Sequence, residues 1–378
     1  MSSKKPVVCH MTIALMPFDP RIFHKECAAL VKAGYEVHLV VRHKRDEVVD
    51  GVHIHALPEP PNRAAKILFW PWVVYRKVLS LRPLPAVCHF YDPPMLLAGM
   101  ALRLKGFKVI FDVRENVADQ ILTKYYIPKG LRKIASLVYR FAEAIMTSGM
   151  ATVHVLDSIA CRYRHPKVVV RNLPKLSVIP SGLSRARRKC PRLIYVGGIT
   201  IHRGAITMIE LAGELKRRKV DFELRIVGET AIAKTEQKMR AMIAEKSLEK
   251  EVALLGQMPY EQALLEVASA DIGLCVLHPI PNHLNSLATK ILEYMQYELP
   301  VVASDFPCWR EYVTGTGSGV LVDPLDVEKI ADGVQWLLER PDEMRRMGQR
   351  GRKAVLERYN WEKEQEKLLA FYERLLSR

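Results

Sequence analysis

Short apolar runs alternate with segments of helical spacing along the first half of the chain. Residues 19–33 show the helical pattern, because apolar side chains recur on one face and Gly34 follows as a stop signal. Buried strands are predicted where apolar residues run together, at 7–15, 35–41, 52–57, 86–90, 109–112 and 151–156. Further helices are predicted over 64–81, with an interruption at Pro71, and over 95–105 and 131–147. The alternation favours a parallel sheet with helices on both faces.

The pattern changes at residues 171–192, where prolines and a cluster of arginines indicate an exposed linker. A second alternation follows. Its predicted strands are 193–196, 222–227, 253–255, 272–276, 300–303 and 319–322, and its predicted helices are 206–219, 232–246 and 260–268. Two consecutive alternations of similar size predict an α/β protein of two Rossmann-like domains facing across a cleft. Ligands are then expected beyond the carboxyl ends of the strands.

Charge is distributed unevenly between the two halves. The 378 residues include 57 Lys and Arg and 41 Asp and Glu, a net charge of +16. Residues 1–175 hold 27 basic and 13 acidic residues, a net of +14, whereas residues 176–378 hold 30 and 28, a net of +2. The basic half predicts an anionic partner, either nucleic acid or a membrane surface. Because no recognised nucleic-acid module accompanies the charge, we expect no nucleic-acid partner.

Composition and missing motifs exclude several classes of protein. Hydrophobic residues make up 49% and charged residues 26%, and no apolar run approaches the ~18 residues of a spanning helix. The seven cysteines form no C-x-x-C pair, so we expect reduced thiols instead of disulfides or a zinc site. The dinucleotide, Walker and nucleophile-elbow glycine patterns are also absent. The N-terminus lacks a signal-peptide pattern, and a cytoplasmic protein is expected.

The strongest local signal is the segment Y-V-G-G-I-T-I-H-R-G at residues 195–204. Gly197 and Gly198 follow a predicted strand, where glycines let the backbone approach a ligand closely. Arg203 precedes the next predicted helix, so an anionic group there would meet both a guanidinium and helix N–H groups. A glycine-rich turn with a solvated arginine is the alternative interpretation.

A second signal is the segment N-S-L-A-T-K-I-L-E-Y-M, followed by P-V-V-A-S. A helix is expected to start near Leu287, and the small side chains of Ala288 and Thr289 would leave first-turn N–H groups open to a phosphate. Lys290 and Glu293 lie one turn apart on the same face, so they could hold a diphosphate and a ribose diol. A surface Lys–Glu pair is the alternative.

Together these segments resemble the retaining glycosyltransferases of family 4, which have the GT-B fold. The family patterns Y-V-G-R-L-x-x-x-K-G, E-x7-E, P-V-V-A-S, G-x-L-V-x-P and Y-S-W-E each have a similar counterpart here. D-V-R-E resembles the D-V-H-E of the capsule, exopolysaccharide and lipopolysaccharide branch, as do two opening segments. The matching residues are 195–204, 285–293, 300–304, 319–324, 359–362, 112–115, 16–23 and 33–37.

The resemblance implies an acceptor domain at 1–175, a donor domain at 176–360 and a C-terminal helix at 361–378 that crosses back to the first domain. It also implies a metal-independent transferase that retains configuration and holds no permanent cofactor. The expected substrates are a nucleotide sugar, with a UDP-sugar foremost, and a glycan or lipid-linked acceptor.

The same resemblance assigns roles to individual residues. Arg203 and Lys290 are expected to stabilise the leaving diphosphate as catalytic residues. Asp19, Arg114 and Glu115 are expected on the acceptor side, from their positions alone. The residues expected to bind the nucleotide sugar are Gly197, Gly198, Arg203, Asn285, Ala288, Thr289, Lys290 and Glu293, the last on the ribose.

Four residues depart from the family pattern. Gly198 stands in place of Arg and Arg203 in place of Lys, while Asn285 replaces the first Glu of E-x7-E and Arg114 replaces the His of D-V-H-E. These changes leave open a weak or inactive GT-B scaffold. A GT-B sugar-nucleotide epimerase or phosphorylase is a further alternative.

Residues 63–82 combine five Lys and Arg with two Trp, one Phe and one Tyr, and hold no acidic residue. Basic residues beside aromatic and aliphatic ones favour an interfacial helix on anionic lipid. The alternative is a helix that packs its apolar side into the core. We therefore expect the basic domain to dock peripherally on the inner face of the cell membrane, where a lipid-linked acceptor would be found.

Overall fold

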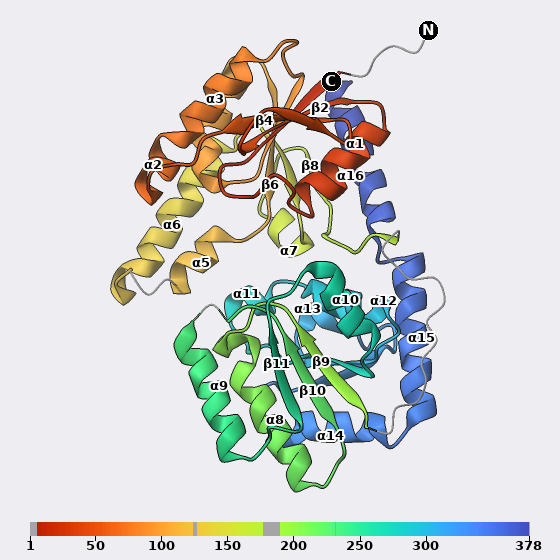
Figure 1. The fold of residues 1–378 in the computed structure, drawn as a ribbon. Helices are drawn as coiled ribbons and strands as arrows, with labels where there is room; N and C mark the ends of the chain where they lie inside the picture. Colours follow the sequence, from red (N-terminus) through yellow and green to blue (C-terminus); the bar gives the residue numbers. More distant parts are fainter. Residues whose placement is uncertain (1–5, 124–126, 177–189, 231, 378) are drawn as a thin grey trace. The chain divides into compact units, whose positions relative to one another are not determined.

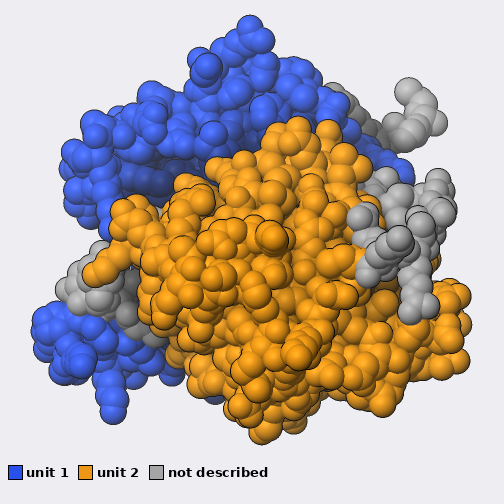
Figure 2. Space-filling model, turned by 60° about the horizontal axis from the view of Figure 1, so that its bottom comes forward, with its two compact units in different colours: residues 1–172, 361–378 blue, residues 173–360 orange. Residues whose placement is uncertain are grey.

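The computed structural model describes residues 6–123, 127–176, 190–230 and 232–377. The chain divides into two compact units, which are residues 1–172 with 361–378 (unit 1) and residues 173–360 (unit 2). Figure 2 colours them separately. Each unit has a mostly parallel sheet flanked by helices, which confirms the predicted two-domain α/β class (Figure 1).

The described residues of unit 1 form an eight-stranded sheet with the order β3-β4-β2-β1-β5-β6-β7-β8. The strands are β1 (Val7–Met11), β2 (Glu36–Arg42), β3 (Glu47–Val49), β4 (Val52–Leu57), β5 (Val87–Phe90), β6 (Lys108–Val113), β7 (Ala151–His154) and β8 (Lys167–Val169). Only β3 pairs antiparallel to its neighbour among them. The strands β1, β5 and β7 are buried along their whole length, which explains why most of their residues are apolar. Their buried polar residues are His10, His89, Thr152 and His154.

Helices cover both faces of this sheet. They are η1 (Ile22–Cys27), α1 (Ala28–Lys32), α2 (Arg63–Leu68), α3 (Trp70–Ser80), η2 (Pro93–Met95), α4 (Leu96–Leu104), α5 (Val117–Thr123), α6 (Lys129–Met146), α7 (Asp157–Ala160) and α16 (Trp361–Leu376). Adjacent residues of β1 point to opposite faces, because Val8 packs with α1 and α16 whereas Cys9 packs with α3 and α4. The last helix of the chain is therefore part of the core of unit 1.

The structure divides the helix predicted over 19–33, and it also shows the break predicted within 64–81. Asp19 accepts hydrogen bonds from the backbone N–H groups of Arg21 and Ile22 at 3.0 and 2.9 Å, and the π-helical turn η1 then leads into α1. The interruption at Pro71 is confirmed, since this proline lies in the first turn of α3, where its missing N–H costs nothing. The edge strands β3 and β8 were not predicted, because three residues are too few for a periodic signal.

The described residues of unit 2 form a six-stranded parallel sheet with the order β11-β10-β9-β12-β13-β14. The strands are β9 (Arg192–Val196), β10 (Glu223–Val227), β11 (Val252–Gly256), β12 (Ile272–Cys275), β13 (Val301–Ser304) and β14 (Gly319–Val322). The helices are η4 (Ile201–Arg203), α8 (Ala205–Arg217), α9 (Ala233–Glu245), α10 (Tyr260–Ala268), α11 (Pro281–Leu284), α12 (Thr289–Gln296), α13 (Pro307–Arg310), α14 (Val327–Leu338) and α15 (Pro341–Glu357). No helix in the described part of the chain is long and apolar enough to cross a bilayer.

Two local differences from the predicted pattern appear in unit 2. Arg192 is buried at the start of β9 and pairs with Glu223 at 2.9 Å, so it does not belong to an exposed linker. Residues 177–189 of that predicted linker lie outside the described residues. The helix expected from near Leu287 begins at Thr289, because Ala288 keeps an extended backbone.

Candidate functional site

A glycine turn follows β9 in unit 2 and packs directly on the neighbouring turn. Gly197 has φ +135° and Gly228, after β10, has φ +145°. A Cβ atom on Gly228 would lie 2.0 Å from the carbonyl oxygen of Gly197, so only glycine fits there. The Gly197 N–H donates to the carbonyl oxygen of Val227 at 2.9 Å. The turn is therefore held firmly at the carboxyl end of the sheet, with no side chain of its own above it.

Two cationic side chains reach over this turn. A Cβ on Gly197 would lie 3.0 Å from Lys290 Nζ, and a Cβ on Gly198 would lie 3.1 Å from Arg203 Nη1. Lys290 comes from the first turn of α12 and Arg203 from the end of η4. The structure thus brings together the two glycines and the two cations that the sequence analysis singles out.

Lys290 is held in an unusual state for a lysine. Its Nζ is shielded from solvent, has no hydrogen-bond partner among the described residues, and lies 3.6 Å from the centre of the Tyr195 ring. Burial, together with the nearby Arg203 charge, lowers the pKa of Lys290 to about 8. A shielded cation without an acceptor is costly for the free protein, so it calls for an anionic partner.

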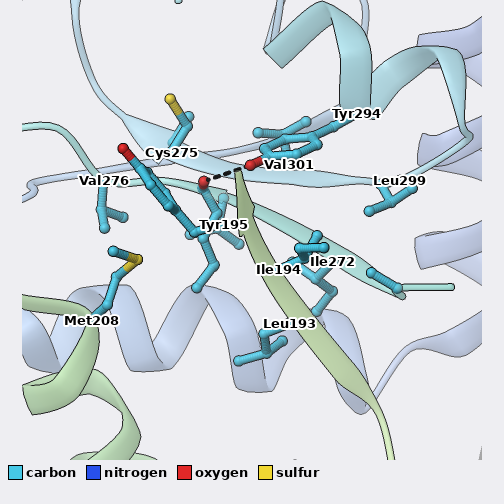
Figure 3. Packing of buried hydrophobic residues seen from close by; sticks show 14 of the residues in the cluster. Leu193, Ile194, Tyr195, Met208, Ile272, Cys275, Val276, Tyr294, Leu299 and Val301 are labelled. Carbon is cyan, nitrogen blue, oxygen red and sulfur yellow. Dashed lines mark hydrogen bonds between the residues drawn. The ribbon is translucent and has the colours of Figure 1, made fainter. Parts of the chain in front are cut away.

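Tyr195 supports this lysine, and the sequence analysis did not select it as a site residue. Its hydroxyl donates to the Gly198 carbonyl at 2.9 Å, which fixes the ring beneath Nζ. Figure 3 shows Tyr195 among the apolar side chains around β9, with Tyr294 close by. Tyr195 is the first residue of the Y-V-G-G motif, but its place in a predicted buried strand gives no local sign of a role in the site.

Gly204, which follows Arg203, fixes the position of this arginine. The Thr200 hydroxyl accepts from the Arg203 N–H at 3.2 Å and caps η4. Gly204 follows with φ +82°, and a Cβ on it would lie 2.4 Å from the carbonyl oxygen of Val276. The turn that carries Arg203 is therefore pressed against the end of β12, while the guanidinium itself is exposed.

The start of α12 is positioned by contacts from two sides. The Tyr294 hydroxyl accepts from the Val196 N–H at 2.9 Å, which ties α12 to β9. The indole of Trp309 donates to the Ser286 carbonyl at 2.6 Å and holds the preceding loop. Ala288 supplies no side-chain cap, which leaves the N–H groups of Thr289 and Lys290 open to an anion, whereas the Ile291 N–H donates to the Ala288 carbonyl at 3.0 Å.

The remaining predicted donor-side residues differ in their placement. Glu293 lies one turn beyond Lys290 on α12 and is close enough for its charge to act on the lysine. Asn285 is exposed, and its amide donates to the carbonyl of Pro281 at 3.1 Å. Asn285 is therefore engaged with its own helical turn, and no described contact joins it to the two cations.

The predicted acceptor-side residues lie in unit 1 and are only partly assembled. Arg114 pairs with Asp19 at 3.4 Å and stacks over the Tyr91 ring at 4.9 Å. Glu115 is exposed and accepts from Gln120, without a described contact to that pair. Asp19 also caps η1 through its two backbone contacts, so part of its role is structural.

Unit 1 also holds a cavity of about 550 Å³ at the carboxyl ends of β1, β2 and β5, which the sequence analysis missed. Asp92 lies at its wall, where its carboxylate accepts from the Thr12 hydroxyl and the Ile13 N–H at 2.7 Å each. Burial raises the pKa of Asp92. The basic side chains of the lining are Arg63, Lys66 and Arg42, and the last of these pairs with Glu59 at 2.6 Å. A larger cavity, of about 850 Å³ between β14 and α14, is lined by neither Lys290 nor Arg203.

A buried polar network lies beneath this region of unit 1. Ligand-type atoms of His10, Glu26 and His89 come within 4.8 Å of one another. The Arg21 guanidinium pairs with Glu26 at 2.8 Å and with Asp112 at 3.0 Å, so a positive charge already occupies the centre. A metal cation there would be repelled by Arg21, and the arrangement fits an ion-pair network better than a metal site.

Two family models match consecutive parts of the chain. Residues 21–182 match "Glycosyl transferase 4-like domain" and residues 184–354 match "Glycosyl transferases group 1". A similar curated protein is the alpha-D-kanosaminyltransferase of Streptomyces kanamyceticus, 29% identical over 159 residues. The alignment covers 42% of this chain and 39% of that relative's length.

Two solved structures share the fold over the whole chain. Sucrose-phosphate synthase from Thermosynechococcus elongatus superposes with a TM-score of 0.79 at 17% identity, covering 99% of this chain and 100% of that one. Anabaena Alr3699/HepE in complex with UDP-glucose superposes with a TM-score of 0.73 at 11% identity, covering 99% and 100%.

Proposed function

We propose that this chain, which belongs to the GT-B glycosyltransferases of the GT4 type, transfers sugar from a UDP-sugar to a glycan or lipid-linked acceptor. Retention of configuration and a role in cell-surface polysaccharide synthesis are parts of the proposal. The observation that carries it is the pair Lys290 and Arg203 above a bare glycine turn. A nucleoside diphosphate is the ligand whose charge matches this pair.

The leaving diphosphate becomes more negative as the glycosidic bond breaks. Cations fixed before the reaction stabilise that developing charge more than they stabilise the bound substrate, which lowers the barrier. The glycine turn lets phosphate oxygens approach the backbone, and the first turn of α12 adds N–H donors. Glu293 is proposed to bind the ribose hydroxyls from the same helix. Two fixed cations can supply the charge that a divalent metal supplies in other transferases, so we propose a metal-independent reaction.

The acceptor is proposed to bind on unit 1. Asp19 and Arg114 lie near the carboxyl ends of parallel strands, where open α/β sheets bind ligands. Glu115 is proposed as a further contact on this side. The 550 Å³ cavity offers space for part of an acceptor, and its basic side chains suit an anionic one. We propose a cytoplasmic protein that acts at the inner face of the membrane.

A nucleotide-binding scaffold without transferase activity is the second candidate. The observation that favours it is Asn285, which stands where the family pattern has a carboxylate and bonds back to Pro281. Such a protein would bind a nucleoside diphosphate through Lys290 and Arg203 but would turn over no donor.

A panel of nucleotide sugars separates the two functions. Thermal shift measures binding, because a ligand of the folded state raises the melting temperature by mass action. Release of nucleoside diphosphate, with acceptor or by slow hydrolysis, measures turnover. The transferase proposal expects both signals with a UDP-sugar, the scaffold expects the first alone, and neither signal with any donor would contradict both.

A further inference from the structure

Helix α6 presents its apolar side to solvent. Six large apolar side chains recur at helical spacing along it and are between 54% and 71% exposed. They are Leu131, Ile134, Leu137, Val138, Phe141 and Ile145, called the α6 face below. A helix that packs on a sheet normally buries such a face.

The polar side of α6 is the side turned toward the protein. Ser136 is buried, and the Tyr139 hydroxyl donates to Glu143 at 3.0 Å. Burial raises the pKa of Glu143. Arg132 donates to the carbonyl of Ile127 at 2.8 Å. Because these polar groups are satisfied inside, the orientation of α6 is specified by its contacts. Among the described residues of unit 1, none buries the α6 face, whose side chains stay more than half exposed.

Other helices of unit 1 also expose apolar side chains. Helix α4 contacts both α6 and α3, and it exposes Leu97 by 51% and Leu104 by 75%. Figure 1 shows α6 at the margin of unit 1, alongside α5. At the junction of α2 and α3, Phe69 is 64% exposed, while Val74 and Val78 are buried. The segment 63–82 is therefore partly a core element, and α6 offers the longer apolar stripe.

Charge decides between the partners that could cover this stripe. Residues 129–146 hold four basic residues and a single acidic one, the buried-side Glu143. Arg140 pairs with Asp119 at 2.8 Å, whereas Lys129 and Lys133 are exposed. In a symmetric dimer through α6, neither copy would offer the other's cations an acidic partner from this helix, because its one carboxylate, Glu143, lies on the inner side. An anionic bilayer instead takes up the apolar stripe and attracts the flanking cations.

We propose that the α6 face docks unit 1 on an anionic lipid bilayer. The apolar side chains enter the boundary between headgroups and acyl chains, and Lys129 and Lys133 contact the lipid phosphates. Docking would bring the enzyme to a lipid-linked acceptor, and only this purpose rests on the proposed function.

Vesicle co-sedimentation tests the docking on the full chain. Phosphatidylcholine vesicles with and without phosphatidylglycerol are mixed with the wild type, with Leu137→Ser and with Leu265→Ser. Leu137 in α6 and Leu265 in unit 2 are matched, being 68% and 70% exposed. We expect binding to anionic vesicles that weakens as salt rises. Leu137→Ser should reduce the partition coefficient by about tenfold, as expected when one leucine no longer leaves water, and Leu265→Ser should not.

Vesicle partition, light scattering and UDP affinity together separate docking on lipid from dimer formation and from nucleotide binding. Equal partition of the two serine variants, or a wild type that ignores anionic vesicles at low salt, overturns the proposal. A dimer in light scattering that Leu137→Ser dissolves would assign the face to a second copy and also overturns it. UDP affinity is measured alongside and should be the same in all three proteins. Docking without any nucleotide binding would leave the α6 inference standing while the proposed function fails.

Discussion

Each unit holds a cation away from water, and the two cations differ in their partners. Arg21 of unit 1 is buried between Glu26 and Asp112 and also donates to the Val170 carbonyl at 3.0 Å. Lys290 of unit 2 has its Nζ shielded over the Tyr195 ring with no hydrogen-bond acceptor. The comparison separates two uses of a buried charge. A cation with all its partners inside the protein stabilises the fold, whereas a cation without them is prepared for a ligand.

The largest expected effect comes from Arg21→Met, which removes the cation in direct contact with the buried carboxylates of Glu26 and Asp112. We expect the free energy of unfolding to fall by about 3–5 kcal/mol, measured by chemical denaturation. Arg217→Met is the control, because Arg217 forms an exposed pair with Glu214 and its loss should leave stability near that of the wild type. If both variants were equally stable, the network around Arg21 would not be structural.

Lys290→Met tests the other member of the comparison. It should lower turnover by about two to three orders of magnitude, corresponding to about 2–4 kcal/mol of transition-state stabilisation. The melting temperature should be unchanged or higher, because the variant removes a shielded charge and keeps the side-chain volume. The control is Lys238→Met on α9, at an exposed lysine. Near-normal turnover in Lys290→Met would contradict the role assigned to this residue.

Glu293→Gln should have a smaller effect that appears mainly in nucleotide affinity. A ribose contact is made in both the ground state and the transition state, so its loss weakens binding more than it slows turnover. We expect UDP affinity by calorimetry to fall by about tenfold, as for a hydrogen bond to a charged group. Glu245→Gln on α9 should leave affinity unchanged, and an unaffected Glu293→Gln would rule out the ribose role.

The smallest effect is a change of nucleotide affinity with pH. The charged form of Lys290 binds the diphosphate, and its pKa in the free protein is lowered to about 8. Affinity for UDP should therefore be constant below this pH and decline above it, as the lysine loses its proton. Lys290→Met should bind UDP weakly at every pH, and its affinity should not decline above pH 8 as that of the wild type does. A wild-type profile that stays flat well above pH 8 would argue against a lowered pKa.

Much of the candidate site could be predicted because its signals are local. Two glycines after an apolar strand indicate a close-approach turn whatever the rest of the chain does. Lys290 and Glu293 share a face because residues three apart on a helix always do. The position of Arg203 could also be predicted, because it directly precedes a predicted helix. Asn285 was expected beside the nucleotide sugar on resemblance alone, and its placement depends on the short helix α11, which has no periodic signal.

The sequence alone predicts the alternation of strands and helices, the two α/β units and the glycine turn followed by Arg203, because each depends on neighbouring residues. The approach of Lys290 to Gly197 joins two segments far apart in the chain and comes from the tertiary structure. Only the tertiary structure decided that the Tyr195 ring lies beneath Lys290, since 95 positions separate the two. It also decided that the helix predicted over 131–147 turns its apolar side outward. Helical periodicity shows that such a face exists, but what the face meets depends on the polar groups packed behind it.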